Sequence, residues 1–307
     1  MPTYNELKMF QNYPLDLKIA KSSLRIREFY NAMGGAVACS FSGGKDSTVL
    51  LHLVRSIYPN TLAIFSDTGL EFPEIRSFVK TFDNVEIVRP KKSFRQVLEE
   101  YGYPVIGKEV ANVIDGARKG QEYRLQRLDP EYKSRFNVSK YAYLLDAPFK
   151  ISDRCCYHMK KAPMEKFMRK SGLSPYLGTM AEESSLRTQK WLQHGCNMID
   201  SKSPKSQPLS FWREQDIWEY INHFGLEVAE PYHMGYKRTG CVFCMFGAQC
   251  EKAPNRFQLL QRTHPKLWAY CMRDWESGGL GLAGVLDYLK IPYEDNQLTF
   301  NVKGMDA

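Results

Sequence analysis

The sequence predicts an α/β fold with an open, mostly parallel, twisted sheet flanked by helices. Short apolar runs rich in small and β-forming residues occur at residues 36–41, 61–66 and 84–90. Segments with the apolar spacing of amphipathic helices lie between and after these runs. Strands that alternate with helices in this way are typical of a parallel sheet covered by helices.

The expected elements follow in a regular order. The expected strands are AVACSF (36–41), TLAIFS (61–66), NVEIVRP (84–90) and, as the best later candidate, PYLGTM (175–180). The expected helices cover residues 15–33, 46–58, 93–102 and the second part of 67–82, which begins as a loop. The helix over 46–58 has the clearest amphipathic pattern.

Three regions are expected along the chain. They are an N-terminal helical extension (1–34), a nucleotide-binding α/β domain (35–228) and a C-terminal region with a cysteine loop and helices (229–307). Within the second region, residues 116–142 mix basic and aromatic residues without a clean period. A solvated connecting excursion is the first interpretation of this segment. A contact face for nucleic acid or another large substrate is the second.

Composition narrows the class of protein. The 307 residues are 43% hydrophobic and 25% charged, as in ordinary globular proteins. No uncharged apolar run approaches the ~20 residues of a membrane helix, and MPTYNELKMFQ lacks the apolar core of a signal peptide. A cytoplasmic protein without membrane contact is therefore expected. In that setting its eight cysteines are expected as core thiols, reactive thiols or metal ligands rather than as disulfides.

The segment CSFSGGKDST (39–48) joins the first expected strand to the helix after it. In open α/β sheets, ligands bind where a strand ends and a helix begins. Gly43 and Gly44 allow the backbone to approach an oxyanion, and the first amides of the helix attract negative charge. Lys45 adds a cation. The segment therefore predicts a phosphate-binding turn.

This turn is not a Walker A loop. That motif requires glycine where Cys39 stands and serine or threonine where Asp46 stands. An acidic residue inside a phosphate turn needs a purpose, such as holding Mg²⁺ against a polyphosphate or capping the helix. Both roles for Asp46 stay open at this point.

The string SGGKDS (42–47) resembles the PP-loop of the adenine-nucleotide alpha-hydrolase superfamily, the N-type ATP pyrophosphatases. Segments that resemble the phosphoadenylylsulfate reductase family are DTGLEFPE (67–74), GTMAEESSLR (178–187), PLSFWREQDIWEYI (208–221) and GYKRTGC with CVFC (235–244). The resemblance runs from about residue 36 to 250. It implies a Rossmann-like, HUP-type PP-loop domain and an enzyme that splits ATP between its α and β phosphates.

The resemblance also implies roles for individual residues. Lys45, Asp46 and Arg187 are expected to be catalytic. Nucleotide and Mg²⁺ are expected at Ser40, Ser42, Gly43, Gly44, Lys45, Asp46, Ser47, Asp67, Gly178 and Glu183. Lys108 is a further candidate for neutralising phosphate. Simpler roles stay open, since Asp67 suits the capping of a turn and Lys108 suits solvent. Arg187 is placed to pair with Glu183 one helical turn earlier.

Two cysteine pairs have the pattern of a metal site: Cys155 with Cys156, and Cys241 with Cys244 in a CxxC turn. Four thiolates can hold zinc or an iron–sulfur cluster. Adjacent cysteines diverge and suit the separated corners of a cubane, and the pattern resembles that of the iron–sulfur adenylylsulfate reductases. We therefore expect an irregular C-terminal iron–sulfur region with a [4Fe-4S] cluster. Zinc and a redox or core role are the alternatives.

The remaining cysteines give weaker signals. Cys39 lies on the first expected strand and is expected in the core. The roles of Cys196, Cys250 and Cys271 stay open, with a sulfur-carrying or substitute ligand role for Cys196 or Cys250 as the minority interpretation.

Two reactions fit the resemblance. Reductases of adenylylsulfate or its phosphorylated form share a cysteine in a C-terminal Glu-Cys-Gly-(Ile/Leu)-His context, and this sequence has no cysteine after Cys271. They also generally lack the lysine of the turn, which is present here as Lys45. ATP pyrophosphatase activity coupled to sulfur transfer is therefore favoured over reduction. A nucleotide- and cluster-binding sensor without catalysis is the third interpretation.

An intact ATP-type turn together with four cysteines resembles the enzymes of DNA phosphorothioation and, next, those of tRNA thiolation. This resemblance implies ATP, Mg²⁺, a nucleic-acid acceptor and a cysteine desulfurase as sulfur donor. The net charge of +8 agrees with a polyanionic partner. A homodimer is left open.

Overall fold

The computed structural model describes residues 2–297, which form two compact units. Of the described residues, unit 1 contains residues 2–67, 71–90 and 162–239. Unit 2 contains residues 68–70, 91–161 and 240–297. Each unit is assembled from segments that are distant in the sequence. The boundaries expected after residues 34 and 228 do not coincide with these units, and the predicted domains stay predictions.

Unit 1 contains a six-stranded sheet in the order β3-β2-β1-β4-β6-β5. The strands are β1 (Val37–Ser40), β2 (Leu62–Ser66), β3 (Val85–Val88), β4 (Ser174–Tyr176), β5 (Asn197–Met198) and β6 (Lys205–Ser206). Neighbouring strands are parallel except for β5 and β6, which are antiparallel. The predicted α/β fold with a mostly parallel sheet is confirmed, and β1 to β4 correspond to the four expected strands.

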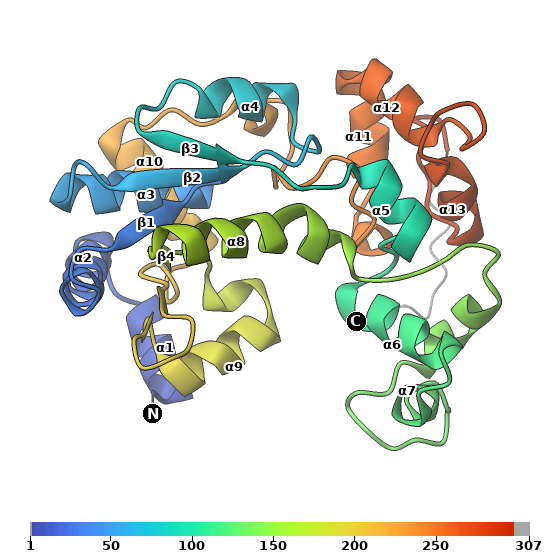
Figure 1. Ribbon diagram of the computed structural model, residues 1–307, viewed down its shortest axis with the longest axis horizontal. Coiled ribbons are helices and arrows are strands. Elements are labelled where there is room, and N and C mark those ends of the chain that lie inside the picture. The colour runs from blue at the N-terminus through green and yellow to red at the C-terminus, as the bar shows by residue number, and fades with distance from the viewer. Residues whose placement is uncertain (1, 298–307) are drawn as a thin grey trace. The chain divides into compact units, whose positions relative to one another are not determined.

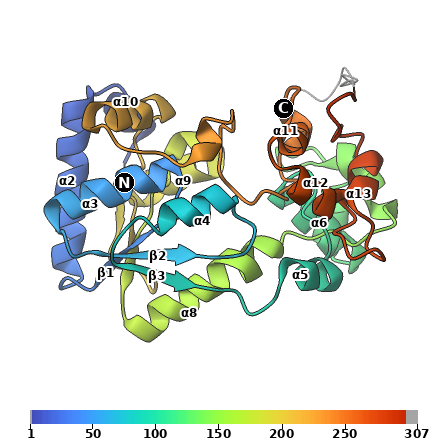
Figure 2. The ribbon, with the colours of Figure 1, turned by 90° about the horizontal axis from the view of Figure 1, so that it is seen from above.

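Helices cover both faces of this sheet (Figure 1). They are α1 (Tyr4–Gln11), α2 (Leu15–Ala32), α3 (Lys45–Ile57), α4 (Pro73–Val79), α8 (Ala162–Ser171), α9 (Ser185–His194) and α10 (Glu214–Phe224), with short 3₁₀ turns η3 (Ala181–Glu183) and η4 (Glu230–Tyr232). α3 packs on β1 and against α2 and α10, whereas α8 packs on β2 and β3 from the opposite face (Figure 2). The central strands are therefore enclosed.

The apolar residues of these elements explain the layering. Ala38 on β1 and Ile64 on β2 are completely buried, as a strand covered on both faces requires. On α3, Val49, Leu50 and Val54 are also completely buried, and their spacing forms one helical stripe. The helix predicted at 46–58 thus turns its apolar stripe to the sheet.

The N-terminal helix α2 is part of the core of unit 1. Lys18 is 1% exposed, and its Nζ lies 2.6 Å from Oδ2 of Asp216 on α10. The indole Nε1 of the buried Trp212 donates to Oγ of Ser22 over 2.9 Å. Because a buried charge is costly unless it is paired, the Lys18–Asp216 ion pair fixes how α2 meets α10.

Unit 2 consists mainly of helices. They are α5 (Phe94–Tyr101), α6 (Lys108–Arg118), α7 (Glu122–Gln126), α11 (Arg256–Thr263), α12 (Pro265–Met272) and α13 (Leu282–Tyr288), with the π-helix η2 (Tyr157–Lys161) and 3₁₀ turns η1 (Ser139–Asp146) and η5 (Ala248–Cys250). Completely buried side chains, among them Val113, Leu144 and Phe257, form its core. Among residues 2–297, none of the helices combines the length and the apolar character of a bilayer crossing.

Replacing Lys18 by methionine should lower the free energy of unfolding by about 3 kcal/mol, because Asp216 is left buried without its cation. Urea denaturation followed by tryptophan fluorescence measures this change. Arg27→Met is the matched control, since Arg27 is exposed on the same helix. Equal effects of the two substitutions would contradict the structural role of the ion pair.

Candidate functional site

The predicted phosphate turn lies where the strand order of unit 1 reverses. β1 ends at Ser40 and α3 begins at Lys45, so residues 41–44 form the connection. β2 and β3 lie on one side of β1, and β4 lies on the other. In open α/β sheets, ligands bind at such a reversal, outside the carboxyl ends of the strands.

The segment after β4 lies against the first turn of α3. A Cβ atom added at Gly178 would lie 3.0 Å from the backbone oxygen of Asp46. A side chain at this position would therefore push the two segments apart. The structure thus brings Gly178 and the 42–47 segment together at one edge of the sheet.

Hydrogen bonds within the turn hold its shape. The hydroxyl of Ser47 donates to the carbonyl of Gly44 over 2.8 Å, and the amide of Ser42 donates to the same hydroxyl over 3.1 Å. Oγ of Ser42 lies 3.0 Å from Oγ of Ser47. The two predicted serines therefore stabilise the turn before any ligand is bound.

Gly43 has two reasons to be glycine. Its φ is +71°, a left-handed conformation that side chains disfavour. A Cβ atom there would also lie 2.9 Å from the side chains of both Ile75 and Val79 on α4. The turn is therefore pressed against α4.

Lys45 is the central charge of the site. Its side chain is 5% exposed, and its Nζ lies 3.2 Å from Oδ1 of Asp46 and 3.3 Å from Oε1 of Glu214. Burial acts to lower the pKa of Lys45, but nearby acidic groups, Asp46 first, outweigh it and the pKa is raised. Burial raises the pKa of Asp46, an effect that Lys45 opposes. A cation and a carboxyl group thus stand together at the amino end of α3.

Tyr232 and Thr239 contact the turn and were not predicted. The amide of Lys45 donates to the hydroxyl of Tyr232 over 2.9 Å, and that hydroxyl lies 3.2 Å from Oγ1 of Thr239. A Cβ atom at Gly44 would lie 2.9 Å from Oγ1 of Thr239. The one signal for them was the GYKRTGC motif, which contains Thr239 and begins three residues after Tyr232 but was interpreted only as a cysteine loop.

Asp67 lies at the end of β2 and is 6% exposed. Its Oδ2 accepts hydrogen bonds from Nη2 of Arg76 over 3.0 Å and from Nε of Arg89 over 3.3 Å. The buried carboxylate of Asp67 is thus paired with two arginine side chains that are largely exposed to solvent. The predicted nucleotide contact of Asp67 stays a prediction.

Arg187 forms an ion pair with Glu183 one helical turn earlier. The carboxylate of Glu183 also accepts a hydrogen bond from the amide of Met180 over 2.9 Å. These contacts close the turn between β4 and α9, which is the simpler of the two roles considered for Arg187. Glu183 also acts on Asp46, whose pKa it helps to raise after the larger effect of burial.

The four predicted ligand cysteines lie in unit 2 and influence one another electrostatically. Cys155 and Cys156 precede the π-helix η2, and the turn of Cys241 and Cys244 is closed by a 3.1 Å hydrogen bond between their backbones. The hydrogen bond with Cys156, burial, and then the other cysteine pair raise the pKa of Cys155. The pKa of Cys155 thus responds to each of the other three cysteines.

The Cys156 thiol has a lowered pKa, whereas the pKa values of Cys155 and Cys244 are raised. The hydrogen bond from Cys155, together with Lys108 and Lys160, lowers the pKa of Cys156 to about 6. Lys108, considered earlier as a phosphate contact, thus interacts with a cysteine in the structure. Among residues 2–297, the structure contains no group of three or more histidine, cysteine, aspartate or glutamate side chains that could hold a metal ion. The cluster stays a prediction.

The other cysteines are mostly structural. Cys39 on β1 is buried, as expected of a core residue, and burial raises its pKa to about 12. Cys271 is completely buried in unit 2, and Cys196 is a buried acceptor for the hydroxyl of Ser210 over 3.3 Å. Cys250 is exposed.

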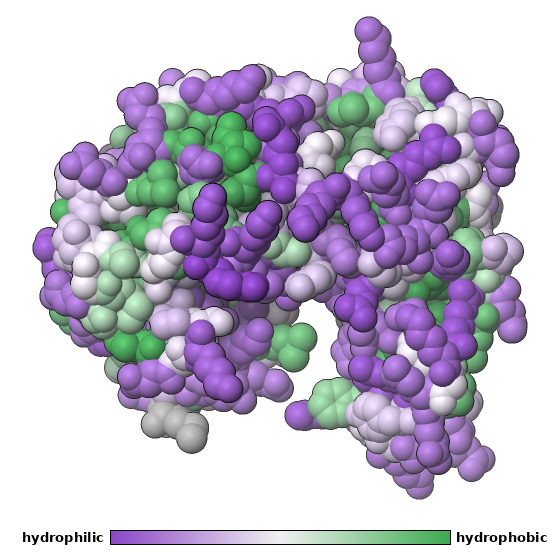
Figure 3. Space-filling model, viewed as in Figure 1, coloured by the Kyte–Doolittle hydropathy of each residue, from purple (hydrophilic) through white to green (hydrophobic). Residues whose placement is uncertain are grey.

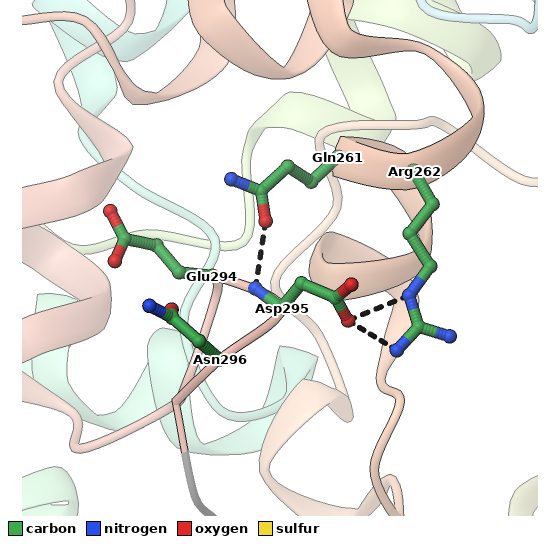
Figure 4. Close-up of a pocket in the computed structure, with 5 residues that line it drawn as sticks. All are labelled: Gln261, Arg262, Glu294, Asp295 and Asn296. Carbon is green, nitrogen blue, oxygen red and sulfur yellow. Dashed lines mark hydrogen bonds and ion pairs between the residues drawn. The ribbon is translucent and has the colours of Figure 1, made fainter.

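A surface pocket of unit 2 contains none of the predicted site residues (Figure 4). Its lining residues are Gln261, Arg262, Glu294, Asp295 and Asn296. Arg262 and Asp295 form an ion pair across it, and the amide of Asp295 donates to Oε1 of Gln261 over 2.7 Å. Most of its polar groups are thus engaged with one another.

A known protein family matches the part of the chain that contains the phosphate turn and the two cysteine pairs. The model of the phosphoadenosine phosphosulfate reductase domain matches residues 36–119 and 107–246. The chain belongs to the phosphoadenosine phosphosulfate reductase domain family. The matched residues include the phosphate turn and all four predicted ligand cysteines.

Individual relatives are distant. An uncharacterized protein of Methanocaldococcus jannaschii is 26% identical over 82% of this chain, which spans about half (51%) of that relative's length. The adenosine 5'-phosphosulfate reductase of Staphylococcus haemolyticus is 26% identical over 73% of this chain and 76% of the relative. A crystal structure of phosphoadenylyl-sulfate reductase from Candida auris matches 78% of this chain and 96% of that chain at 15% identity, with a TM-score of 0.44.

Gly43→Ala should lower the free energy of unfolding by about 3 kcal/mol, because it combines left-handed strain with overpacking against α4. Gly34→Ala isolates the first effect, since Gly34 has a φ of +57° with no atom within 4 Å of the added Cβ. That control should lose about 1 kcal/mol. Chemical denaturation compares the two, and an equal loss would show that α4 does not constrain the turn.

Proposed function

We propose that this protein is an ATP pyrophosphatase that activates an acceptor for sulfur transfer. The observation that carries the proposal is the buried, charged Lys45 beside Asp46 at the amino end of α3. A triphosphate brings several negative charges that require a cation, backbone amides and Mg²⁺. Adenylylsulfate has neither β nor γ phosphate, so this arrangement suits ATP better.

The proposed reaction uses the turn for positioning and charge neutralisation. The amides of Gly43 and Gly44 face the phosphates, and Lys45 neutralises the β and γ groups. An acceptor oxygen attacks the α phosphorus, the bond from that phosphorus to the oxygen bridging to the β phosphorus breaks, and pyrophosphate leaves. Asp46 would hold Mg²⁺, which shields the charge of the leaving group when it is bound.

Tyr232 has a specific part in this proposal. Its hydroxyl accepts the hydrogen bond of the Lys45 amide, which is one of the first donors of the helix. A phosphate oxygen that binds at this amide must take over that hydrogen bond. Tyr232 is therefore proposed to move aside or to donate a hydrogen bond from its hydroxyl to the phosphate.

The proposed acceptor is nucleic acid, with DNA phosphorothioation first and tRNA thiolation next. The terminal sulfur of a desulfurase persulfide would attack the activated position, so that the activated oxygen leaves with AMP, and an external dithiol would then reduce the resulting S–S bond and leave one sulfur on the acceptor. Cys155, Cys156, Cys241 and Cys244 would hold a [4Fe-4S] cluster that handles this sulfur. The lowered pKa of Cys156, next to Lys108 and Lys160, supports a thiolate ligand at that position, and a thiolate is the form of cysteine that ligates a cluster.

Adenylylsulfate reduction is the second candidate. The observation that favours it is the relative from Staphylococcus haemolyticus, whose name is adenosine 5'-phosphosulfate reductase. Both candidates use an adenine nucleotide at the same turn. They differ in the bond that breaks and therefore in the product, which is pyrophosphate for the first and sulfite for the second.

Lys45→Ala and Asp46→Ala should each slow pyrophosphate release from ATP and Mg²⁺ by about 100-fold or more, because the first removes a cation at the leaving group and the second removes the proposed Mg²⁺ ligand. A coupled pyrophosphate assay measures the rate. Lys80→Ala is the control, since Lys80 is exposed at the end of α4. Release of inorganic phosphate in place of pyrophosphate would refute the proposed cleavage.

Anaerobically purified protein should contain about four irons per chain and a broad absorbance near 400 nm, as cysteine-ligated cubanes do. Cys155→Ala or Cys241→Ala should lose most of this iron. Cys250→Ser should keep it, because Cys250 is exposed and outside the predicted ligand set. Elemental analysis that finds stoichiometric zinc in place of iron would exclude the cluster.

A further inference from the structure

We infer that the surface around α7 in unit 2 binds single-stranded nucleic acid. The residues of this basic–aromatic face are Tyr123, Arg124, Lys133, Arg135, Phe136 and Lys140. The inference rests on the proposed function, which needs a nucleic-acid acceptor, and it gives that acceptor a strand form and a binding surface. All of these residues lie within unit 2.

The segment is an ordered platform rather than a loose connection. Arg127 is 4% exposed, forms an ion pair with Glu109 on α6, and donates from Nε to the carbonyl of Phe136 over 2.8 Å. Nδ2 of Asn137 donates to the carbonyls of Asp129 over 2.7 Å and of Tyr132 over 2.9 Å. These bonds fix the loop after α7 and therefore the side chains that it presents.

Two aromatic rings project from this platform. Tyr123 is 53% exposed and Phe136 is 42% exposed. The guanidinium carbon of the buried Arg127 lies 6.0 Å from the centre of the first ring and 5.7 Å from the centre of the second. The rings are thus held near each other by one buried residue. Both rings therefore have surface that a partner can reach.

Each exposed ring has a second cation beside it. The guanidinium carbon of Arg124 lies 5.9 Å from the ring centre of Tyr123, and that of Arg135 lies 4.7 Å from the ring centre of Phe136. Nζ of Lys140 likewise lies 5.2 Å from the ring centre of Tyr141. A ring that stacks on a base, with a cation placed for the adjoining phosphate, is the combination that single strands require.

Charge alone does not carry this inference. Residues 116–142 contain seven basic and three acidic residues. Of the basic ones, Arg118 donates to four backbone carbonyls, Arg127 is buried, and Lys119 pairs with Asp115. The exposed Lys133, Arg135 and Lys140 remain at the surface with the half-buried Arg124. Figure 3 shows that hydrophilic residues dominate this part of unit 2, at the lower right.

The ring faces select single strands over duplexes. In a duplex, each base is stacked on its neighbours and has no free face for a protein ring. In a single strand, bases turn outward and stack on aromatic side chains. An acidic protein would satisfy the cations but would leave the two rings without a partner of matching shape.

The test measures binding of a fluorescein-labelled 20-nucleotide single strand to the full-length protein by fluorescence anisotropy, without ATP and with EDTA. Tyr123→Ala combined with Phe136→Ala should weaken binding by about tenfold or more, because each ring stacks on a base. Arg135→Ala should reduce the slope of log K against log salt by about 0.7, the value for one phosphate contact with a single strand.

Tyr4→Ala is the matched control, because Tyr4 in unit 1 is 54% exposed with Nζ of Lys8 5.4 Å from its ring centre. It should leave binding unchanged. Circular dichroism of the double variant confirms that it is folded. An equal loss in the control, unchanged binding in the double variant, or tighter binding of a duplex or of polyglutamate would overturn the inference.

Failure of oligonucleotide binding and failure of the proposed ATP pyrophosphatase activity give different results, because the two are measured separately. Oligonucleotide binding through this face without pyrophosphate release would support the inference and refute the ATP pyrophosphatase proposal. Pyrophosphate release without oligonucleotide binding would support the ATP pyrophosphatase proposal and refute the nucleic-acid-binding face.

Discussion

The candidate site depends on one constraint, which is the short connection between β1 and α3. The chain must leave a strand buried between two helical layers and start a helix within residues 41–44. Gly43 makes this possible through a left-handed backbone that presses against α4. The result is a helix whose first amides stand at the reversal of the sheet order. Lys45 and Asp46, the first two residues of α3, are placed by this connection.

Lys45 gains its properties from the same constraint. It is the first residue of α3, and its buried side chain lies beside Asp46 on the same helix and Glu214 on α10, while its amide donates to the hydroxyl of Tyr232. A lysine in solvent would be mobile and hydrated. Here the charge is held in place, and this is the preorganisation on which catalysis by charge neutralisation depends.

The sequence predicted the local features well, because they depend on short patterns. The strands at 36–41 and 61–66 were found from composition, and the helix over 46–58 from its apolar spacing. Contacts between distant segments could not be predicted. Glu214 and Tyr232 reach Lys45 only because the fold brings α10 and η4 to the turn. The assembly of each unit from separate segments is likewise a tertiary property that no local pattern encodes.

The most direct measurement of the central claim compares two substrates on the same enzyme preparation. The anaerobic protein receives either ATP with Mg²⁺ and a nucleic-acid acceptor, or adenylylsulfate with a thiol reductant, and pyrophosphate and sulfite are both quantified. The account predicts AMP and pyrophosphate from ATP and no sulfite from adenylylsulfate. Robust sulfite formation without pyrophosphate release would contradict it and establish the reductase.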